Sequence, residues 1–253
     1  MSSTLRLVWF DLKTELNPPV WIIGEWTTFL IQIGIYGAII SQLVTGIDNY
    51  RQWFAIGAVI MLTFDMGAHA GRHFVEDAHE GRLPYLLSLP LSRSQLFLTI
   101  ALQGGAELAL MMSVPLTVTL LIIGNLTWIS VTAVVLALFW LGFGVASLML
   151  ALSFIAFKSS DLYVAMVTGL SAIIIRFSTA LYPFIFLPAQ YATVAVFNPL
   201  TYGSDLVRLI LGFNPSLLMN PVHAVIVLTA LSVCTLSLGL FLVQRLVEGV
   251  KSG

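Results

Sequence analysis

The sequence predicts an all-α membrane protein with six transmembrane helices. Of its 253 residues, 58% are hydrophobic and only 9% are charged, whereas about 25% of the residues of a soluble domain are charged. So few charges cannot cover the surface of a soluble globule, and lipid must therefore surround most of the chain. The lengths of the apolar stretches agree, because a bilayer core of about 30 Å takes about 20 helical residues.

Six apolar stretches, each with at most two charged residues, have this length. They run from about Pro19 to Val44, Trp53 to Gly71, Ser94 to Ile123, Trp128 to Phe157, Asp161 to about Tyr182, and Val222 to Val243. The turn signal Gly124-Asn125 separates the third stretch from the fourth. The first stretch has no short apolar core before a small-residue cleavage site, so we expect a permanent helix and not a removed signal peptide.

The basic residues predict the orientation. With the N-terminus in the cytoplasm, Arg51 and Arg208 fall outside and Arg176 falls within a span. The other eight basic residues are then cytoplasmic: Arg6, Lys13, Arg72, Arg82, Arg93, Lys158, Arg245 and Lys251. This asymmetry predicts a multi-pass protein with both termini in the cytoplasm.

Residues 1–18 differ from the spans. Leu5, Trp9, Leu12 and Leu16 recur at helical spacing among charged residues, and Pro18-Pro19 ends the pattern. We expect an amphipathic helix that contacts membrane lipids on the inner leaflet. Residues 19–253 then form a single transmembrane domain.

Two further segments interrupt the bundle pattern. In the cytoplasmic loop 74–93, Pro84 can begin a short helix with exposed leucines and Pro90 can end it. In the segment 183–215 on the outer side, prolines break an apolar stretch. Non-helical backbone at membrane depth needs protein or a water-filled cavity around it, so this segment predicts re-entrant or interfacial pieces.

Four ionisable residues fall within the spans: Glu25, Asp65, Glu107 and Arg176. Glu107 and Arg176 lie about 20 and 22 Å from the cytoplasmic ends of their helices, so they can pair, either to lock the packing or to gate a path. Glu25 and Asp65 lie only about 9 and 11 Å in and are expected at the solvated ends of a shared cavity.

A stripe of possible metal ligands runs along the second span. Asp65, His69, His73 and Asp77 recur every four residues. A straight stripe brings only two neighbouring side chains to one ion, whereas zinc takes three or four ligands. We therefore interpret the stripe as a polar helix end and expect no metal site. The net charge of −1, without a Lys/Arg cluster, also argues against a nucleic-acid partner.

Two motifs resemble ABC-2 type permeases, the membrane subunits of many ATP-binding-cassette exporters. Glu80-Gly81-Arg82-Leu83 with Leu86-Leu87-Ser88-Leu89-Pro90-Leu91-Ser92-Arg93 resembles the family's loop between its second and third helices. Phe197-Asn198-Pro199-Leu200-Thr201-Tyr202 with Asp205-Leu206-Val207-Arg208 resembles its outer signature before the last helix. The chain departs from the family at Pro84-Tyr85, where an acidic residue is frequent.

The resemblance implies a non-catalytic permease in a prokaryotic plasma membrane. Its expected partners are a soluble ATPase subunit and a second permease, identical or homologous. ATP and Mg²⁺ would bind to the ATPase, since this chain has no P-loop sequence and is expected to bind no cofactor itself. The residues implied at the ATPase contact are Glu80, Gly81, Leu83, Leu86, Leu87, Pro90, Ser92 and Arg93. Those implied at an outer gate are Asn198, Pro199, Tyr202 and Arg208.

Other functions remain open from the residues alone. An ATP-independent channel or secondary transporter is the first alternative, although the chain shows no internal repeat with paired broken helices. A membrane-embedded metal enzyme built on the Asp/His stripe is the second. The substrate stays undetermined among lipids, drug-like amphiphiles, peptides and polymers.

Overall fold

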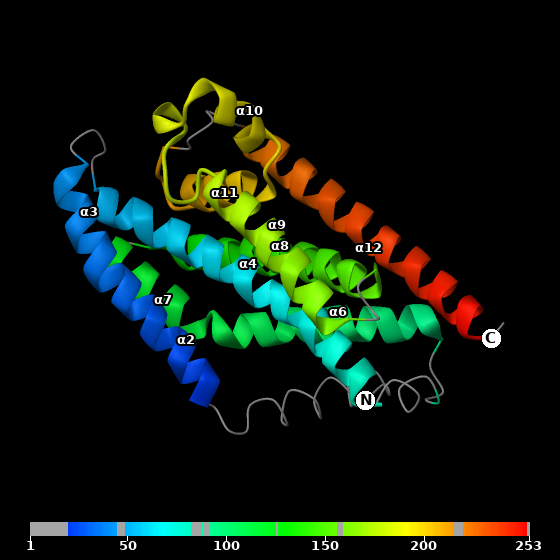
Figure 1. Cartoon of the computed structure of the whole chain (residues 1–253). Helices are drawn as coiled ribbons and strands as arrows, with labels where there is room; N and C mark the ends of the chain where they lie inside the picture. The colour runs from blue at the N-terminus through cyan, green and yellow to red at the C-terminus, as the bar shows by residue number, and fades with distance from the viewer. Residues whose placement is uncertain are drawn as a thin grey trace.

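The computed structural model describes residues 20–44, 49–81, 88, 92–124, 126–155, 159–214 and 220–251. Every regular element within these ranges is helical, in agreement with the predicted all-α class (Figure 1). The amphipathic helix expected over residues 1–18 lies outside the described residues. The same holds for four residues of the predicted ATPase contact: Leu83, Leu86, Leu87 and Pro90.

Four of the described helices are long and apolar enough to cross a membrane. They are Ile22–Leu43, Tyr50–Asp77, Trp128–Ile155 and Pro221–Leu242. A fifth crossing results if Ser94–Met111 and Ser113–Ile123, which meet at 47°, form one broken span. These apolar helices indicate a membrane protein with four to five candidate spans, where the sequence predicts six.

The difference concerns the predicted fifth span. Its helix, α9, covers Ser160–Arg176 and is 17 residues long, which corresponds to about 25 Å. We expected this helix to continue to Tyr182, but Phe177 ends it and residues 177–182 form turns. Hydrogen bonds from other elements hold these turns, as described below.

The first two predicted spans form long helical runs. The first consists of α2 (Val20–Ile31), the π-helical turn η1 (Gln32–Gly37) and α3 (Ala38–Leu43). The second, α4 (Tyr50–His79), is longer than predicted at both ends. Residues 74–79, which the sequence analysis assigned to a cytoplasmic loop, are therefore helical.

The third predicted span is broken. Instead of one helix over Ser94–Ile123, the chain forms α6 (Arg93–Met111) and α7 (Ser113–Ile123). Pro115 explains the break, because proline has no N–H to donate to the carbonyl of Met111 and its ring clashes with that carbonyl. The indole Nε1 of Trp26 on α2 donates to this carbonyl instead, at 2.8 Å.

The helix α8 (Trp128–Ile155) packs against both α4 and α12 (Pro221–Lys251). Small residues allow the close approach of α4 and α8. A Cβ at Gly67 would lie 2.7 Å from Cγ1 of Val145, and one at Gly71 would overlap the carbonyl of Met149. Small residues at interfaces are typical of helices that associate in lipid.

Three short helices cover one end of the bundle: η2 (Phe184–Phe186), α10 (Ala189–Val196) and α11 (Pro199–Ile210). Figure 1 shows them at the end where α4 and α12 begin. We call this the capped end. We call the opposite end, where α4 stops at His79 and α6 begins at Arg93, the polar end. The α11 helix is buried from Leu200 to Arg208 and packs on α4, α8 and α12.

Candidate functional site

The residues of the predicted outer gate organise α11 at the capped end. Asn198 caps the helix, since its side-chain oxygen accepts from the backbone N–H of Leu200 at 3.0 Å, and Pro199 occupies the first turn. This is the expected arrangement, because a helix start leaves backbone N–H groups unsatisfied and tolerates proline. The Nδ2 of Asn198 donates to the carbonyl of Ile174 at 2.5 Å, so this side chain also ties α11 to α9.

Arg208 is completely buried. Its Nη1 donates to the carbonyl of Thr179 at 2.9 Å and its Nη2 donates to that of Ala180 at 2.7 Å. The nearest carboxylate oxygen, Oδ1 of Asp205, lies 3.5 Å away. The guanidinium lies 3.5 Å above the ring of Trp53, a distance typical of a cation–π contact. Arg208 was expected among the basic residues on the outer side, and the structure shows that its side chain is buried within the protein.

Further polar contacts join the same elements. Tyr50 donates its hydroxyl to the carbonyl of Leu181 at 3.1 Å, and Tyr202 donates to that of Val196 at 2.7 Å. The Oγ1 of Thr201 accepts from the N–H of Thr179 at 3.2 Å. Buried backbone groups without partners are costly. The side chains of α4 and α11 therefore stabilise the turns that follow α9.

A close backbone approach completes this cluster. A Cβ at Gly57 of α4 would overlap the carbonyl oxygen of Ala180, the same oxygen that accepts from Arg208. Only glycine leaves room there for the turn. We call Arg208, Asp205, Trp53, Gly57 and the turn 179–181 the arginine knot. The carbonyls that Arg208 binds are themselves buried. The arginine knot is therefore a packed structural element.

The polar end carries the described part of the predicted ATPase contact. Glu80 and Gly81 are exposed where α4 ends, and Gly81 has a left-handed backbone with φ of 77°. Ser92 caps α6 in a reciprocal arrangement: its Oγ accepts from the N–H of Gln95 at 3.3 Å, and its own N–H donates to the Gln95 side chain at 2.9 Å. Arg93 is the first residue of α6. Ser92 thus has a local role in beginning this helix.

The structure does not bring Glu107 and Arg176 together. Glu107 on α6 is 6% exposed, and its Oε1 lies 3.8 Å from Nε2 of His73 on α4. Arg176 is exposed in the last turn of α9 and forms no ion pair within the described part of the chain. The two residues were expected at one depth, but depth does not fix lateral position. Because α4 contacts both α6 and α9, it supplies the neighbour of Glu107.

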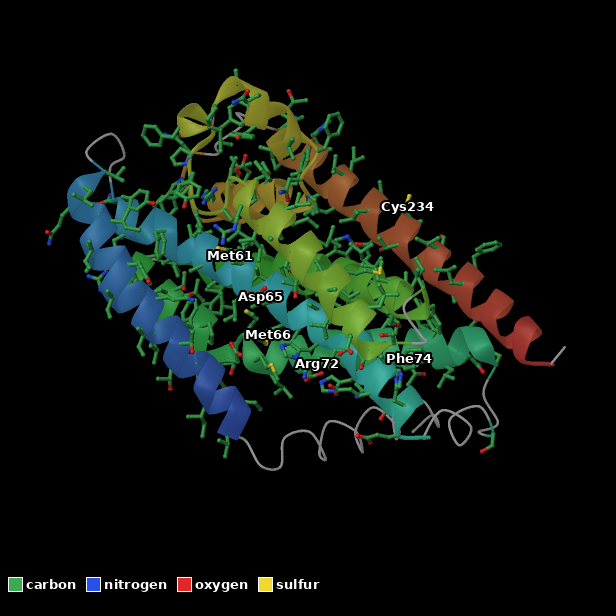
Figure 2. The ribbon with its side chains drawn as sticks, in the orientation of Figure 1. Met61, Asp65, Met66, Arg72, Phe74 and Cys234 are labelled. Atoms are coloured by element: carbon green, nitrogen blue, oxygen red, sulfur yellow. The ribbon has the colours of Figure 1, made fainter. Side chains whose placement is uncertain are left out.

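Of the two other charges within the spans, Asp65 differs from expectation in its depth. Glu25 is half-buried on α2, whereas Asp65 is exposed on α4. Figure 2 shows Asp65 and Arg72 along α4, with Arg72 nearer the polar end. Because α4 continues to His79, Asp65 lies about 21 Å from the end of its helix, deeper than the 11 Å expected. Asp65 is a carboxylate near the middle of a long apolar helix, with Glu25 of α2 as a neighbouring charge.

The half of α4 nearer the polar end carries a row of charged and imidazole side chains. Arg72 donates from Nε to Oε1 of Glu76 at 2.8 Å, and the rings of His69 and His73 lie 6.2 Å apart. Among the residues that the structure describes, no group of three or more His, Cys, Asp and Glu side chains could hold a metal ion. This row of side chains therefore provides charged and hydrogen-bonding groups at the polar end of the molecule.

Two important residues were not singled out from the sequence. The indole of Trp26 donates to the carbonyl of Met111, which is 85 positions away in the sequence. In the sequence, only Pro115 indicates that this carbonyl lacks its usual donor within the helix. Tyr163 on α9 is 2% exposed and donates its hydroxyl to the carbonyl of Ala68 at 2.9 Å. Gly71 makes room for this hydroxyl, which a Cβ would overlap. Neither contact leaves a pattern in the local sequence.

A groove between α4 and α9 opens beside Tyr163. It consists of a hollow of about 380 Å³ toward the polar end and a second of about 170 Å³ farther along. Arg72, Tyr163 and Val164 line both hollows. The groove is a concave feature with several charged side chains around it.

Comparison with known proteins adds no assignment. No protein-family model matches the chain, and a search of curated proteins finds no significant match. The function must therefore be inferred from the residues and their geometry.

Proposed function

We propose that this chain is the transmembrane permease subunit of an ATP-binding-cassette exporter in the plasma membrane of a prokaryote. A separate soluble ATPase, which binds ATP and Mg²⁺, drives the transport. In this proposal the membrane is crossed six times, with α6–α7 as one broken span and α9 as the fifth span, and both termini are cytoplasmic. The basic residues near the polar end support this orientation.

The positions of the two motif segments carry the proposal. Residues 80–92 connect α4 to α6 at the polar end, whereas Asn198 caps α11 and Pro199 to Arg208 lie within this helix at the capped end. An exporter needs one end that receives the motion of an ATPase and another that closes toward the outside. The charged polar end and the buried, hydrogen-bonded capped end suit these two tasks.

Asp65 supports the presence of a second permease copy or a homologous one. A carboxylate that faces lipid near the middle of a span is costly, and such groups usually face water or protein. Asp65 is exposed on the single chain, so a partner or a water-filled path beside α4 would provide its surroundings. A path between two permeases provides both.

The decisive experiment concerns the predicted contact with the ATPase. Leu83, Leu86 and Leu87 have the i, i+3, i+4 spacing of one helix face. Burial of each is worth about 1.5–3 kcal/mol. Leu86→Asp with Leu87→Asp should abolish co-purification of the tagged permease with the ATPase encoded in the adjacent reading frame.

Ser88→Asp is the matched control, because it adds a charge to the same segment at an exposed position. It should leave the complex intact. Both variants should elute from size-exclusion chromatography at the position of the wild-type permease, which verifies folding. Wild-type stoichiometry in the Leu86/Leu87 double variant would contradict the exporter proposal.

A further inference from the structure

The short helix α10 carries an exposed apolar surface. Figure 1 shows this helix at the margin of the capped end. Of its eight residues only Ala195 is buried, whereas Tyr191, Val194 and Val196 are exposed. Phe197, which ends the helix, is 81% exposed. Apolar side chains that gather on an exposed surface mark a contact with a membrane or with another protein.

No charge interrupts this surface. From Phe177 to Ser204 the chain contains no Asp, Glu, Lys, Arg or His. The exposed rings include the amphipathic ring of Tyr191, and Phe186 of η2 is exposed as well. Aromatic side chains are enriched at the boundary between a membrane and water, where an apolar ring and a polar hydroxyl are both accommodated. The composition of α10 therefore fits this boundary better than it fits bulk water.

The exposed aromatic residues continue beyond α10. The helix α8 runs in the same direction as α4, because Gly67 meets Val145 and Gly71 meets Met149. Trp128, the first residue of α8, therefore lies at the capped end, and it is 87% exposed. In a membrane the exposed sides of these apolar helices contact lipid. The surface of α10 is thus continuous with a lipid-facing surface.

A cation lies beside α10. The rings of Phe177 and Tyr191 are 5.1 Å apart, which places α10 next to the end of α9. Arg176 is the last residue of α9, and its side chain is exposed without an ion pair to any described residue. A guanidinium offers a planar set of N–H donors that matches a phosphate group. This charge favours lipid headgroups over an apolar protein surface as the cover of α10.

The depth of Arg176 agrees with this position. The only charged residues of α9 are Asp161 and Arg176, which lie about 22 Å apart along the helix axis. The hydrocarbon core is about 30 Å thick, and the long arginine side chain can extend along the helix to the headgroups. With Asp161 at one headgroup layer, the guanidinium of Arg176 therefore reaches the other.

From these observations we propose that the capped end docks on the headgroup layer of a lipid bilayer. The rings of Phe186, Tyr191 and Phe197 lie where headgroups meet acyl chains, and the guanidinium of Arg176 binds the phosphate of a phospholipid. The helix α10 is then interfacial and not re-entrant, which selects one of the two arrangements that the sequence leaves open. This inference goes beyond the exporter proposal and does not depend on it.

The first experiment measures the depth of α10 in phospholipid nanodiscs. Spin labels are attached to Tyr191→Cys or Phe197→Cys in the full chain, with Cys234→Ser as the background. Collisions with oxygen, which concentrates among the acyl chains, and with a water-soluble nickel chelate report the depth of each label. Two exposed positions serve as references: Glu80 for water, and Leu136, about 12 Å from the start of α8, for the acyl region.

Both α10 labels should be accessible to the nickel chelate to an extent between the two references, and accessible to oxygen as well. The depth of the Leu136 label would mean a re-entrant helix, and the accessibility of the Glu80 label would mean that α10 lies in water. Labels shielded from both reagents would mean that a protein, such as a second copy of the chain, covers α10. Each of these three results would overturn the proposal.

The second experiment tests the phosphate contact of Arg176. The chain carries ¹⁵N in its arginine guanidinium groups and is studied in a buffer without phosphate, so that lipid is the source of ³¹P. Dephasing of the ¹⁵N signal by ³¹P in solid-state NMR measures the guanidinium groups that lie close to phosphate. Arg176→Gln should reduce the dephased signal by the share of one arginine. Gln190→Ala, an exposed change on α10, is the matched control and should leave it unchanged.

An unchanged dephased signal in Arg176→Gln would overturn the assigned phosphate contact. Size-exclusion chromatography verifies the folding of both variants. Neither experiment uses the ATPase, so the outcomes are separate. If α10 has the depth of the headgroups and no ATPase co-purifies with the chain, this inference stands and the exporter proposal is wrong.

Discussion

The two ends of the bundle use charged residues in opposite ways. At the capped end, Arg208 is fully buried and its guanidinium is bonded to two backbone carbonyls and stacked on Trp53. At the polar end, Arg72 is about half-exposed and bonds to the neighbouring Glu76 of its own helix. Arg208 connects elements that are distant in sequence, whereas Arg72 contacts a residue one turn away on its own helix.

This difference indicates which end is fixed and which is available for binding. A buried arginine whose partners are buried carbonyls cannot leave without uncovering groups that water does not reach. A half-exposed ion pair contributes little to stability and can exchange its partner for a ligand at small cost. We therefore expect substitutions at the capped end to act on stability, and those at the polar end to act on binding.

The largest effect is expected at Arg208. Arg208→Ala should reduce the free energy of unfolding in detergent by about 3–5 kcal/mol, because it leaves Asp205 and two carbonyls buried without their cation. Arg51→Ala is the control at the same end of the molecule, since Arg51 is exposed, and it should change stability by less than about 0.5 kcal/mol. Similar losses for both variants would remove the distinction between the two ends.

Gly57→Ala should have the next largest effect, about 1–3 kcal/mol of destabilisation. The added methyl group would overlap the carbonyl oxygen of Ala180, and backbone would have to move. Gly169→Ala on α9 is the matched control, because nothing lies within 4 Å of the position of its Cβ. That variant should be neutral or stabilise by up to about 1 kcal/mol. Thermal unfolding of the two variants in the same detergent measures the contrast.

Ser92 should have a smaller and local effect at the polar end. Ser92→Ala removes the cap of α6 and should cost about 1 kcal/mol. Hydrogen exchange should accelerate in the first turn of α6, above all at the amide of Gln95. Ser94→Ala, an exposed position in the same turn, should leave exchange unchanged. If hydrogen exchange in Ser92→Ala accelerated equally at the capped end, the two ends of the molecule would be coupled.

Arg72 should have the smallest effect on stability. Arg72→Ala removes an i,i+4 ion pair worth about 0.3–0.5 kcal/mol. Arg72→Lys keeps the charge and should lose less stability than Arg72→Ala. Thermal unfolding of both variants in the same detergent measures the difference, and a loss above about 1 kcal/mol in Arg72→Ala would contradict the small contribution of this exposed ion pair.

The sequence was informative where contacts are local. The length of the apolar stretches predicts the four long apolar helices. Asn198-Pro199 has the residue types of a helix start, because capping depends on neighbouring residues, although we interpreted this pair only as a break in an apolar stretch. The break at Met112 was also readable in principle, since Pro115 lies within the predicted third span. These features depend on chain geometry within a turn or two.

The contacts that failed prediction are long-range. Arg208 reaches carbonyls 28 and 29 positions away, and nothing near Arg208 in the sequence indicates them. For Glu107 and Arg176, counting residues from the helix ends predicts how deep each side chain lies in the membrane. It does not predict which helix lies between the two residues. One sequence contains no information on lateral order, and for this reason His73 was not expected beside Glu107.

The bond between Trp26 and Met111 has a consequence for the order of assembly. In lipid, an unsatisfied carbonyl costs several kcal/mol, and the donor for this one comes from α2 and not from the broken span itself. In the proposed arrangement with six spans, α2 emerges first during synthesis, so the donor is already present when α6 and α7 insert. In that arrangement the first span stabilises the third as it inserts, and a chain that begins after Val44 would insert its broken span with that carbonyl exposed to lipid.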